Sequence, residues 1–472
     1  MSTFGALNTA YRGLSAAQQA MDLAGHNVAN AGTAGYTRQR IEQSSIGAPA
    51  PMGLGTTGVQ VGQGVSVDRI ARLGNALLDA SVRTTASSAG YTGARAAAFD
   101  RIEANLREPG ASGLSAQLQA FFAGWQDVAN RPGEAGATSA LLRSAGQLAS
   151  TLSAGRTALE AQWSDTAGDA QQMVASLNDA AAQVAALNTD IRSTIARGGS
   201  ANEMIDARAR LTETISTISG ASVRDEPDGT VTVYLGGNAL VRGDQARGVQ
   251  LEGVTSMAAG TTPRLSWADR PDLEVGLDGG TLAGTLSVLA PADASGTGGP
   301  IAEAAASYDA VATTLATSVN AVHRTGQTST GATGVDFFRL DPTLPPARAL
   351  TVVPTSAAGV ANAAAGAGPL DGSNADAMAQ LARRTDSAGA RWSAFVTATG
   401  SASRAATQQA GIAETSASGA KSAQASGASV SLDEESVSLV AAQHAYQAAA
   451  RVLSAIDEAL DTLINRTGSV GR

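Results

Sequence analysis

Apolar residues recur every seven positions at both ends of the chain. At the N-terminus the repeat comprises Leu7, Leu14, Met21 and Val28, with Phe4 and Tyr11 three residues before two of them. At the C-terminus it comprises Leu432, Leu439, Tyr446, Leu453 and Leu460, and a second series comprises Ala442, Ala449, Ile456 and Leu463. Sustained spacing of this kind is typical of helices that wind around other helices. It predicts a helix at each end with a narrow apolar face that needs a partner.

The C-terminal helix has a recognisable start and end. Ser431 and Glu434 match the S-x-x-E capping box, and Arg466 and Gly468 suit a last turn and a stop. A helix over 431–463 would extend for about 50 Å. Because isolated helices are marginal in water, we predict that both ends are poorly ordered in the free monomer and become ordered on assembly.

The segment after the N-terminal helix has a different pattern. Alternating valines and frequent Gly and Thr predict an extended or hairpin structure over 32–75. Helical periodicity resumes near Ala94 and includes a very long helix over roughly 138–197. Ser200 and Glu203 form a second capping box, which predicts the start of another helix.

A β region follows these helices. The Pro227-Asp228-Gly229 turn lies between strand-like runs, and further runs predict a small β domain over 221–290. Helical periodicity returns over 301–323 and 373–425, around a mixed segment at 330–370.

Together these elements predict a mainly α fold with a β insertion and discontinuous, nested domains. Terminal coiled-coil helices would lie outside a helical-bundle middle domain and a small outer β domain. The predicted boundaries are 1–75 for the N-terminal helix and extended linker, 76–220 and 291–425 for the two parts of the helical domain, 221–290 for the β domain, and 426–472 for the C-terminal helix.

Composition narrows the classes of function. The net charge is −9, Lys421 is the single Lys, and the Arg residues form no dense basic stretch, so we expect no nucleic-acid surface. The chain contains no Cys, which excludes disulfides, thiolate metal sites and Cys nucleophiles. The N-terminus lacks the pattern of a signal peptide, and no apolar run is long enough to span a bilayer, so we expect no membrane insertion.

Catalytic motifs give no support for an enzyme. The glycines of 53–58 match G-x-G-x-x-G, but they lead into alternating valines rather than a helix, so a Gly-rich turn is the better interpretation. His26, His323 and His444 lie far apart, without the spacing of metal ligands. We therefore expect no catalytic residues, no cofactor and no bound metal.

Both ends of the chain resemble a known group of proteins. The segment 13–39 is similar to the N-terminal signature of bacterial flagellar rod, hook and hook-associated proteins. The segments 432–435, 443–449 and 460–463 resemble the C-terminal signature of the same proteins. Within the group, the helical middle favours the hook-associated proteins of the hook–filament junction, the FlgK family, which the chain resembles at 121–132, 206–208, 228–234, 320–326 and 336–338.

The resemblance implies a self-assembling structural protein of the flagellum that connects hook to filament. It implies an extracellular location, reached through the flagellar type III export apparatus without a cleaved signal peptide. The implied partners are further copies of the chain, the hook protein, a second hook–filament junction protein, and an export chaperone on the C-terminal helix.

The resemblance and the heptads together predict an assembly interface. Asn27, Asn30 and Tyr36 would fix the turn after the N-terminal helix, and the heptad residues would carry inner-layer contacts. The predicted interface residues are Leu7, Tyr11, Leu14, Met21, Asn27, Val28, Asn30, Tyr36, Leu432, Leu439, Tyr446, Leu453, Ile456, Leu460 and Leu463.

Three alternatives stay open on the sequence. A flagellar hook or distal rod protein would have a mainly β middle. An enzyme inserted into an axial scaffold would show a metal-ligand or nucleophile motif within 221–370. An exported coiled-coil adhesin would not need paired signatures at its two ends.

Overall fold

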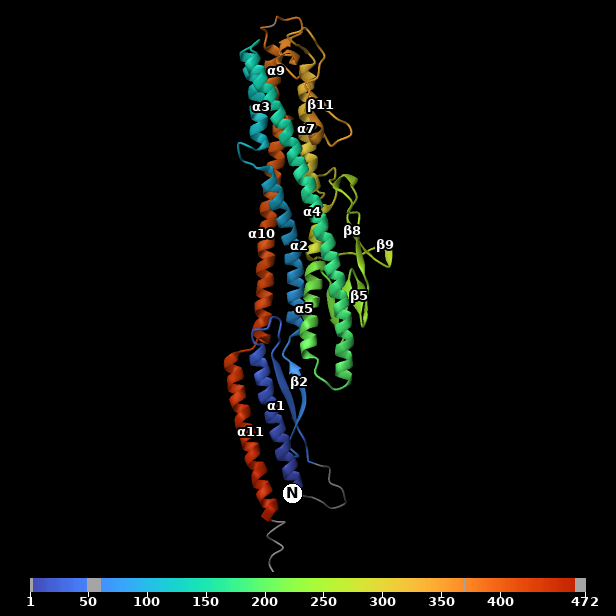
Figure 1. Ribbon diagram of the computed structural model, residues 1–472, viewed down its shortest axis with the longest axis vertical. Helices are drawn as coiled ribbons and strands as arrows, with labels where there is room; N and C mark the ends of the chain where they lie inside the picture. Colours follow the sequence, from blue (N-terminus) through green and yellow to red (C-terminus); the bar gives the residue numbers. More distant parts are fainter. Residues whose placement is uncertain (1–2, 49–60, 369, 463–472) are drawn as a thin grey trace, which may run out of the picture.

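The computed structural model of the 472-residue chain describes residues 3–48, 61–368 and 370–462. The molecule is elongated, and its first and last helices lie together at one end (Figure 1). We call this end the terminal module; it comprises α1 (Thr3–Asn30), β1 (Gln39–Ser45), β2 (Val65–Arg72) and α11 (Leu432–Asp461). We call the remainder, from α2 to α10, the body. The architecture is mainly α with a β insertion, as the sequence pattern predicts.

The helices of the body form a long bundle. They are α2 (Ala76–Leu106), α3 (Leu114–Asn130), α4 (Ala135–Ala196), α5 (Asn202–Ser219), α6 (Gly280–Leu289), α7 (Pro300–His323), α8 (Pro346–Ala349), α9 (Ser373–Gln380) and α10 (Ala388–Ala428), with short 3-10 turns at Met257–Ala259, Ala357–Gly359 and Leu381–Arg383. The very long predicted helix is α4, and α7 matches the helix predicted over 301–323.

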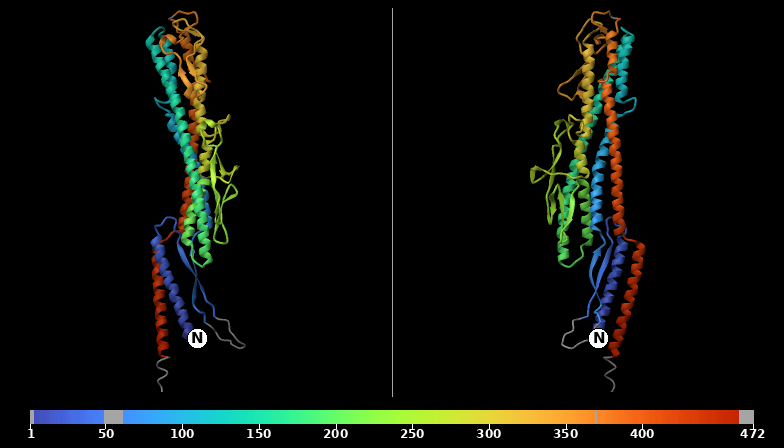
Figure 2. Two further views of the ribbon diagram at one scale, coloured as in Figure 1. Left: turned by 45° about the vertical axis from the view of Figure 1, so that its right-hand side comes forward. Right: turned by 180° about the vertical axis from the view of Figure 1, so that it is seen from behind.

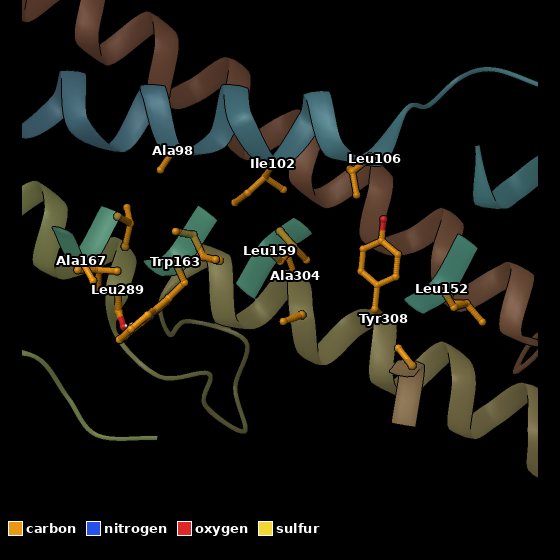
Figure 3. Close-up of a cluster of buried hydrophobic side chains, with 14 of the residues drawn as sticks. Ala98, Ile102, Leu106, Leu152, Leu159, Trp163, Ala167, Leu289, Ala304 and Tyr308 are labelled. Carbon is orange, nitrogen blue, oxygen red and sulfur yellow. Dashed lines mark hydrogen bonds between the residues drawn. The ribbon is translucent and has the colours of Figure 1, made fainter. Parts of the chain in front are cut away.

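The bundle is held by one continuous apolar core. Figure 3 shows part of it, where Ile102 and Leu106 of α2 lie opposite Leu159 of α4 and Tyr308 of α7. Trp163 joins this cluster and donates a hydrogen bond from Nε1 to the carbonyl of Leu289 at 3.0 Å. Each large apolar side chain that is fully buried in this way contributes roughly 1.5–3 kcal/mol.

Small sheets flank the bundle. The β insertion contains a four-stranded sheet of order β3-β4-β5-β6 and a three-stranded sheet of order β7-β8-β9. Its strands are β3 (Ser222–Asp225), β4 (Val231–Leu235), β5 (Asn238–Arg242), β6 (Gln245–Ala246), β7 (Val249–Glu252), β8 (Arg264–Trp267) and β9 (Arg270–Glu274). The mixed segment adds the pairs β10 (Gly326–Gln327) with β13 (Ala363–Ala364) and β11 (Phe338–Leu340) with β12 (Leu350–Val352).

The predicted hairpin after the N-terminal helix is present. β1 and β2 pair antiparallel, with Ile41 opposite Ile70 and a bulge beside Glu42. A two-stranded hairpin is marginal by itself, and this one packs against α1. The G-x-G-x-x-G segment at 53–58 lies outside the described residues.

One predicted helix start and one predicted helix cap are wrong. α2 begins at Ala76 rather than near Ala94, because Asn75 accepts hydrogen bonds from the N–H groups of Leu77 and Leu78. Packing against α6 and α10 then supports a stretch rich in Ser, Thr and Gly. The capping box at Ser200 is absent: α5 starts after Ala201 without a side-chain cap, and Glu203 instead bonds to Gln39.

Two further segments differ from the expected elements. The end of the predicted β domain, at 280–289, is the helix α6. Gly284 allows α6 to approach α2 closely, since a Cβ there would lie 2.4 Å from the carbonyl oxygen of Tyr91. The helix predicted over 373–425 is interrupted between α9 and α10, where Arg384 pairs with Asp386 and Ser387 caps α10 through the N–H of Ala390.

Candidate assembly module and its polar joint

The terminal module is built on α1 and α11, which pack along each other (Figure 2). Small side chains allow a close approach: Ala10, Ala17 and Ala442 are buried, and a Cβ at Gly13 would lie 4.0 Å from that of Ala449. The apolar heptads of the two chain ends therefore meet within one chain. Our prediction that these helices become ordered only on assembly stays a prediction.

The predicted apolar interface residues of the two helices fall into two groups. Those half-buried in the module are Leu7, Leu14, Met21, Leu439, Tyr446, Leu453, Ile456 and Leu460. Tyr11, Val28 and Leu432 are exposed, with 63% of Tyr11 accessible. Leu463 lies outside the described residues, as do Arg466 and Gly468.

Further exposed apolar side chains were not on the predicted interface. Phe4, Val437, Val440 and Val452 are all at least half exposed, and Val437 is 70% accessible. The three valines lie between the heptad positions of α11, so the heptad pattern does not include them. Only the position of α1 shows which side of α11 is covered and which remains open.

Asn27 is the best-connected side chain at the turn after α1, and it is only 2% exposed. Its Oδ1 accepts from the Tyr36 hydroxyl at 2.7 Å and from the N–H of Gln39 at 3.1 Å. Its Nδ2 donates to the Gln39 carbonyl and to Glu435, at 3.0 and 3.1 Å. Asn30 instead makes local contacts, donating to the carbonyl of His26 at 3.0 Å.

Arg38 connects this turn to the start of α11. Its Nε donates to Glu435 at 2.7 Å and its Nη1 to Glu434 at 2.6 Å. Ser431 caps α11 through the N–H of Glu434 as predicted, but the Glu434 side chain binds Arg38 rather than completing the capping box. The carboxylates also suit the helix N-terminus electrostatically.

The first half of α5 supplies the other partners of the turn. Asp206 is buried and accepts from the Thr37 N–H at 3.0 Å and from Arg72 Nε at 2.6 Å. Glu203 accepts from Gln39 Nε2 at 2.9 Å and lies 3.2 Å from His26 Nε2. We call the contacts that Asn202, Glu203 and Asp206 of α5 make with the terminal module the polar joint.

The charges at the polar joint shift the pKa values of Glu203 and of the neighbouring Tyr36. Burial, together with the nearby carboxylates of Glu203, Asp206 and Glu435, raises the pKa of Tyr36 to about 12. Burial opposes ionisation of Glu203, but hydrogen bonds, including the one from Gln39, outweigh it and leave the pKa of Glu203 below its usual value. Tyr36 is therefore a neutral hydrogen-bond donor and Glu203 a charged acceptor near neutral pH.

Metal-binding clusters and membrane-spanning helices are two other features that the described residues could carry. Over 3–48, 61–368 and 370–462, no group of three acidic or His side chains is arranged to hold a metal ion. None of the helices in that part of the chain is long and apolar enough to cross a membrane. His26, His323 and His444 lie on α1, α7 and α11, respectively.

Comparisons with known proteins agree with this layout. Residues 99–338 match the family model of the "flagellar hook-associated protein FlgK helical domain". Residues 7–37 match a flagella basal body rod protein model, and residues 424–466 match the model of the C-terminal part of flagellar basal body rod FlgEFG proteins. The two rod-type matches cover most of the terminal module, and the FlgK match lies within the body.

Individual relatives give the same family. Flagellar hook-associated protein 1 of Bacillus subtilis is 29% identical and is aligned over 100% of both chains. Its counterpart in Salmonella typhimurium is 30% identical over an aligned region that covers 71% of this chain and 59% of that relative.

A solved structure supports the fold. The flagellar hook junction protein FlgK from Burkholderia pseudomallei superposes with a TM-score of 0.62 at 14% identity, covering 74% of this chain and 100% of that one. Because the helical-domain model matches more than half of the sequence, the chain belongs to the FlgK family of flagellar hook-associated proteins, structural components of the bacterial flagellum.

Proposed function

We propose that this protein is the adaptor that joins the hook to the filament of the bacterial flagellum. The observation that carries the proposal is a FlgK-type helical body between two rod-type ends. Rod-type ends favour a place in the flagellar axis, and the FlgK-type body favours the hook–filament junction over the rod or the hook. The role is structural rather than catalytic.

The shape of the chain supports this role. An adaptor has to offer one surface to the hook and another to the filament. In this elongated molecule, the terminal module and the far end of the body lie at opposite ends (Figure 1). Self-assembly is assigned to the terminal module, where Tyr11, Val437 and Val452 leave apolar surface uncovered.

Deletion of the gene tests the proposal. We expect electron microscopy of the deletion strain to show hooks without filaments, and flagellin to accumulate in the medium. Reintroduction of the full-length gene should restore filaments. Loss of the hooks would instead favour a rod or hook protein, and intact filaments would overturn the axial role.

The exposed apolar surface of α11 also suits a more specific partner, an export chaperone. Before export, the exposed apolar side chains of α11, among them Val437 and Val440, need cover, and a helix-in-groove chaperone suits them. We expect Val437→Ser with Val440→Ser to reduce binding of the purified chain to the flagellar export chaperone of the same cells. Ser438→Ala, an exposed change on the same helix, is the control; equal binding by both variants would contradict this assignment.

A further inference from the structure

The contacts that join the terminal module to the body are polar. Among the described residues, the buried members of the apolar core lie between positions 98 and 392, so the core does not extend into the module. The chain passes between the two parts twice, near Gly74 between β2 and α2 and near Ser429 between α10 and α11. No helix in the described part of the body packs along α1 or α11.

Asp206 is central to the attachment. Its two carboxylate oxygens accept separately from Thr37 of the module and from Arg72 at the end of β2, as described above. Arg72 also lies 3.6 Å from Asp79 of α2. Removal of the Asp206 carboxylate would therefore leave a buried backbone N–H and a largely buried guanidinium with fewer partners.

The remaining bonds across the joint are directional as well. Asn202 donates to the side-chain oxygen of Gln39 and to the carbonyl of Ile70, both at 3.0 Å. Arg210 donates to the carbonyl of Ala34 at 3.2 Å, and the N–H of Arg38 donates to the carbonyl of Ala428 at 2.9 Å. Hydrogen bonds of this kind weaken steeply when their angles change, so they fix one orientation and are lost together when it changes.

Two clefts lie between the module and the body, next to the residues that make these bonds. One of about 280 Å³ lies between the 31–37 turn, Asp206 and the end of α10. Another of about 650 Å³ lies between β2 and the α4–α5 turn, next to Asn202. Displacement of the module into either cleft would require no rearrangement of the apolar core.

We infer that the terminal module is a rigid body hinged on the body at the polar joint, with Asp206 as the positioning residue that holds its angle. The module keeps its own structure through the α1–α11 seam and the Asn27–Arg38–Glu435 contacts, while the angle depends on α5. A role for this hinge in fitting the subunit between a hook and a filament whose subunits pack differently rests on the proposed function.

Distance measurements between spin labels can test the hinge, and the absence of Cys makes labelling simple. Labels at Gln443→Cys on α11 and Asp190→Cys on α4 span the joint. Labels at Gln443→Cys and Gln18→Cys report on the module alone. All three sites are exposed. In the labelled chain with Asp206 intact, we expect one narrow distribution of distances across the joint. In Asp206→Ala this distribution should lose its single peak, while the distribution within the module stays narrow.

Glu213→Gln is the matched control, because Glu213 is another acidic residue of α5 and its partner, Lys421, belongs to the body. It should leave both distances unchanged. An unchanged distance across the joint in Asp206→Ala would overturn the inference. Broadening of both distances would overturn it too, since the module would then not be rigid. Because the distances are measured on the purified chain, a result against the hinge would leave the hook–filament role untouched. A gene deletion result against that role would likewise leave the hinge untouched.

Discussion

Asn27 lies at the centre of the contacts that tie the two chain ends together, and its replacement tests their strength. In Asn27→Ala the Tyr36 hydroxyl, the Gln39 N–H and Glu435 each lose a partner. Unsatisfied buried groups cost about 1–3 kcal/mol each. We therefore expect the terminal helices of the variant to melt at a clearly lower temperature than those of the unchanged chain, as monitored by circular dichroism. Asn30→Ala removes only local contacts and should change it much less; equal losses would contradict a central role for Asn27.

His323 is a second residue whose environment makes a testable prediction. Its side chain is fully buried, with Nδ1 2.7 Å from the carbonyl of Val335 and Nε2 2.9 Å from the N–H of Ala361. A neutral ring satisfies both, donating from Nδ1 and accepting at Nε2. Burial lowers the pKa of His323 from its usual value, although the Val335 carbonyl and Asp336 favour the charged ring.

The pH dependence follows from that direction. The folded chain binds fewer protons at His323 than the unfolded chain, so the contribution to stability is complete above the ordinary His pKa of about 6.5 and is lost as the pH falls through the lower folded pKa. We expect urea unfolding to show a loss between about pH 7 and about pH 5 that is smaller in His323→Gln. His444→Gln, on the exposed side of α11, should retain the full dependence; a dependence unchanged in His323→Gln would argue against this origin.

Two asparagines of α4 attach the β insertion to the bundle, and at the scale of elements they act as clamps. Asn188 is buried and holds β4 through both the N–H and the carbonyl of Val231, at 3.0 and 2.9 Å. Asn178 does the same for Val249 of β7. Each side-chain amide thus replaces a missing strand neighbour.

Removal of one clamp should loosen its sheet. In Asn188→Ala the Val231 N–H and carbonyl lose their partner and Arg208 keeps only the carbonyl of Gly229, so we expect a loss of about 1–3 kcal/mol. Hydrogen exchange at β4 should become faster while exchange in α7 stays slow. Thr189→Ala, the next residue on the same helix but exposed, is the control; slow exchange at β4 in both variants would show that the sheet does not depend on the clamp.

Elements with strong periodicity could be predicted from the sequence, whereas those decided by distant contacts could not. The length of α4 and the hairpin β3–β4 follow from apolar spacing and a Pro-Asp-Gly turn. α6 was not predicted, because 280–289 contains two glycines and follows a run of strands. Packing against α2, with a close approach at Gly284, holds this stretch as a helix. At the turn after α1, the sequence predicts Asn27 and Tyr36 as interface residues. It indicates Asp206 only through the family resemblance at 206–208 and not as part of a site, because the partners Thr37 and Arg72 are more than a hundred residues away.

At the scale of the whole molecule, the terminal module has two apolar faces with different expected roles. Leu439 and Leu453 are half-buried in α11, which packs along α1, whereas Val437 and Val452 are exposed. Substitutions at exposed positions usually change stability by less than about 0.5 kcal/mol. Replacement of a packed Leu by Ala costs more, here up to about 2 kcal/mol because burial is partial.

The two faces can therefore be separated by paired variants. We expect Val437→Ser with Val452→Ser to keep the melting temperature of the purified chain but to restore motility poorly in the deletion strain, because assembly would lack its contact surface. Leu439→Ala with Leu453→Ala should lower the melting temperature of the terminal helices first, and lose motility as a consequence. Full motility with the serine pair would show that neighbouring subunits do not use these exposed positions of α11, and would direct attention to Phe4 and Tyr11 on α1, which are also exposed.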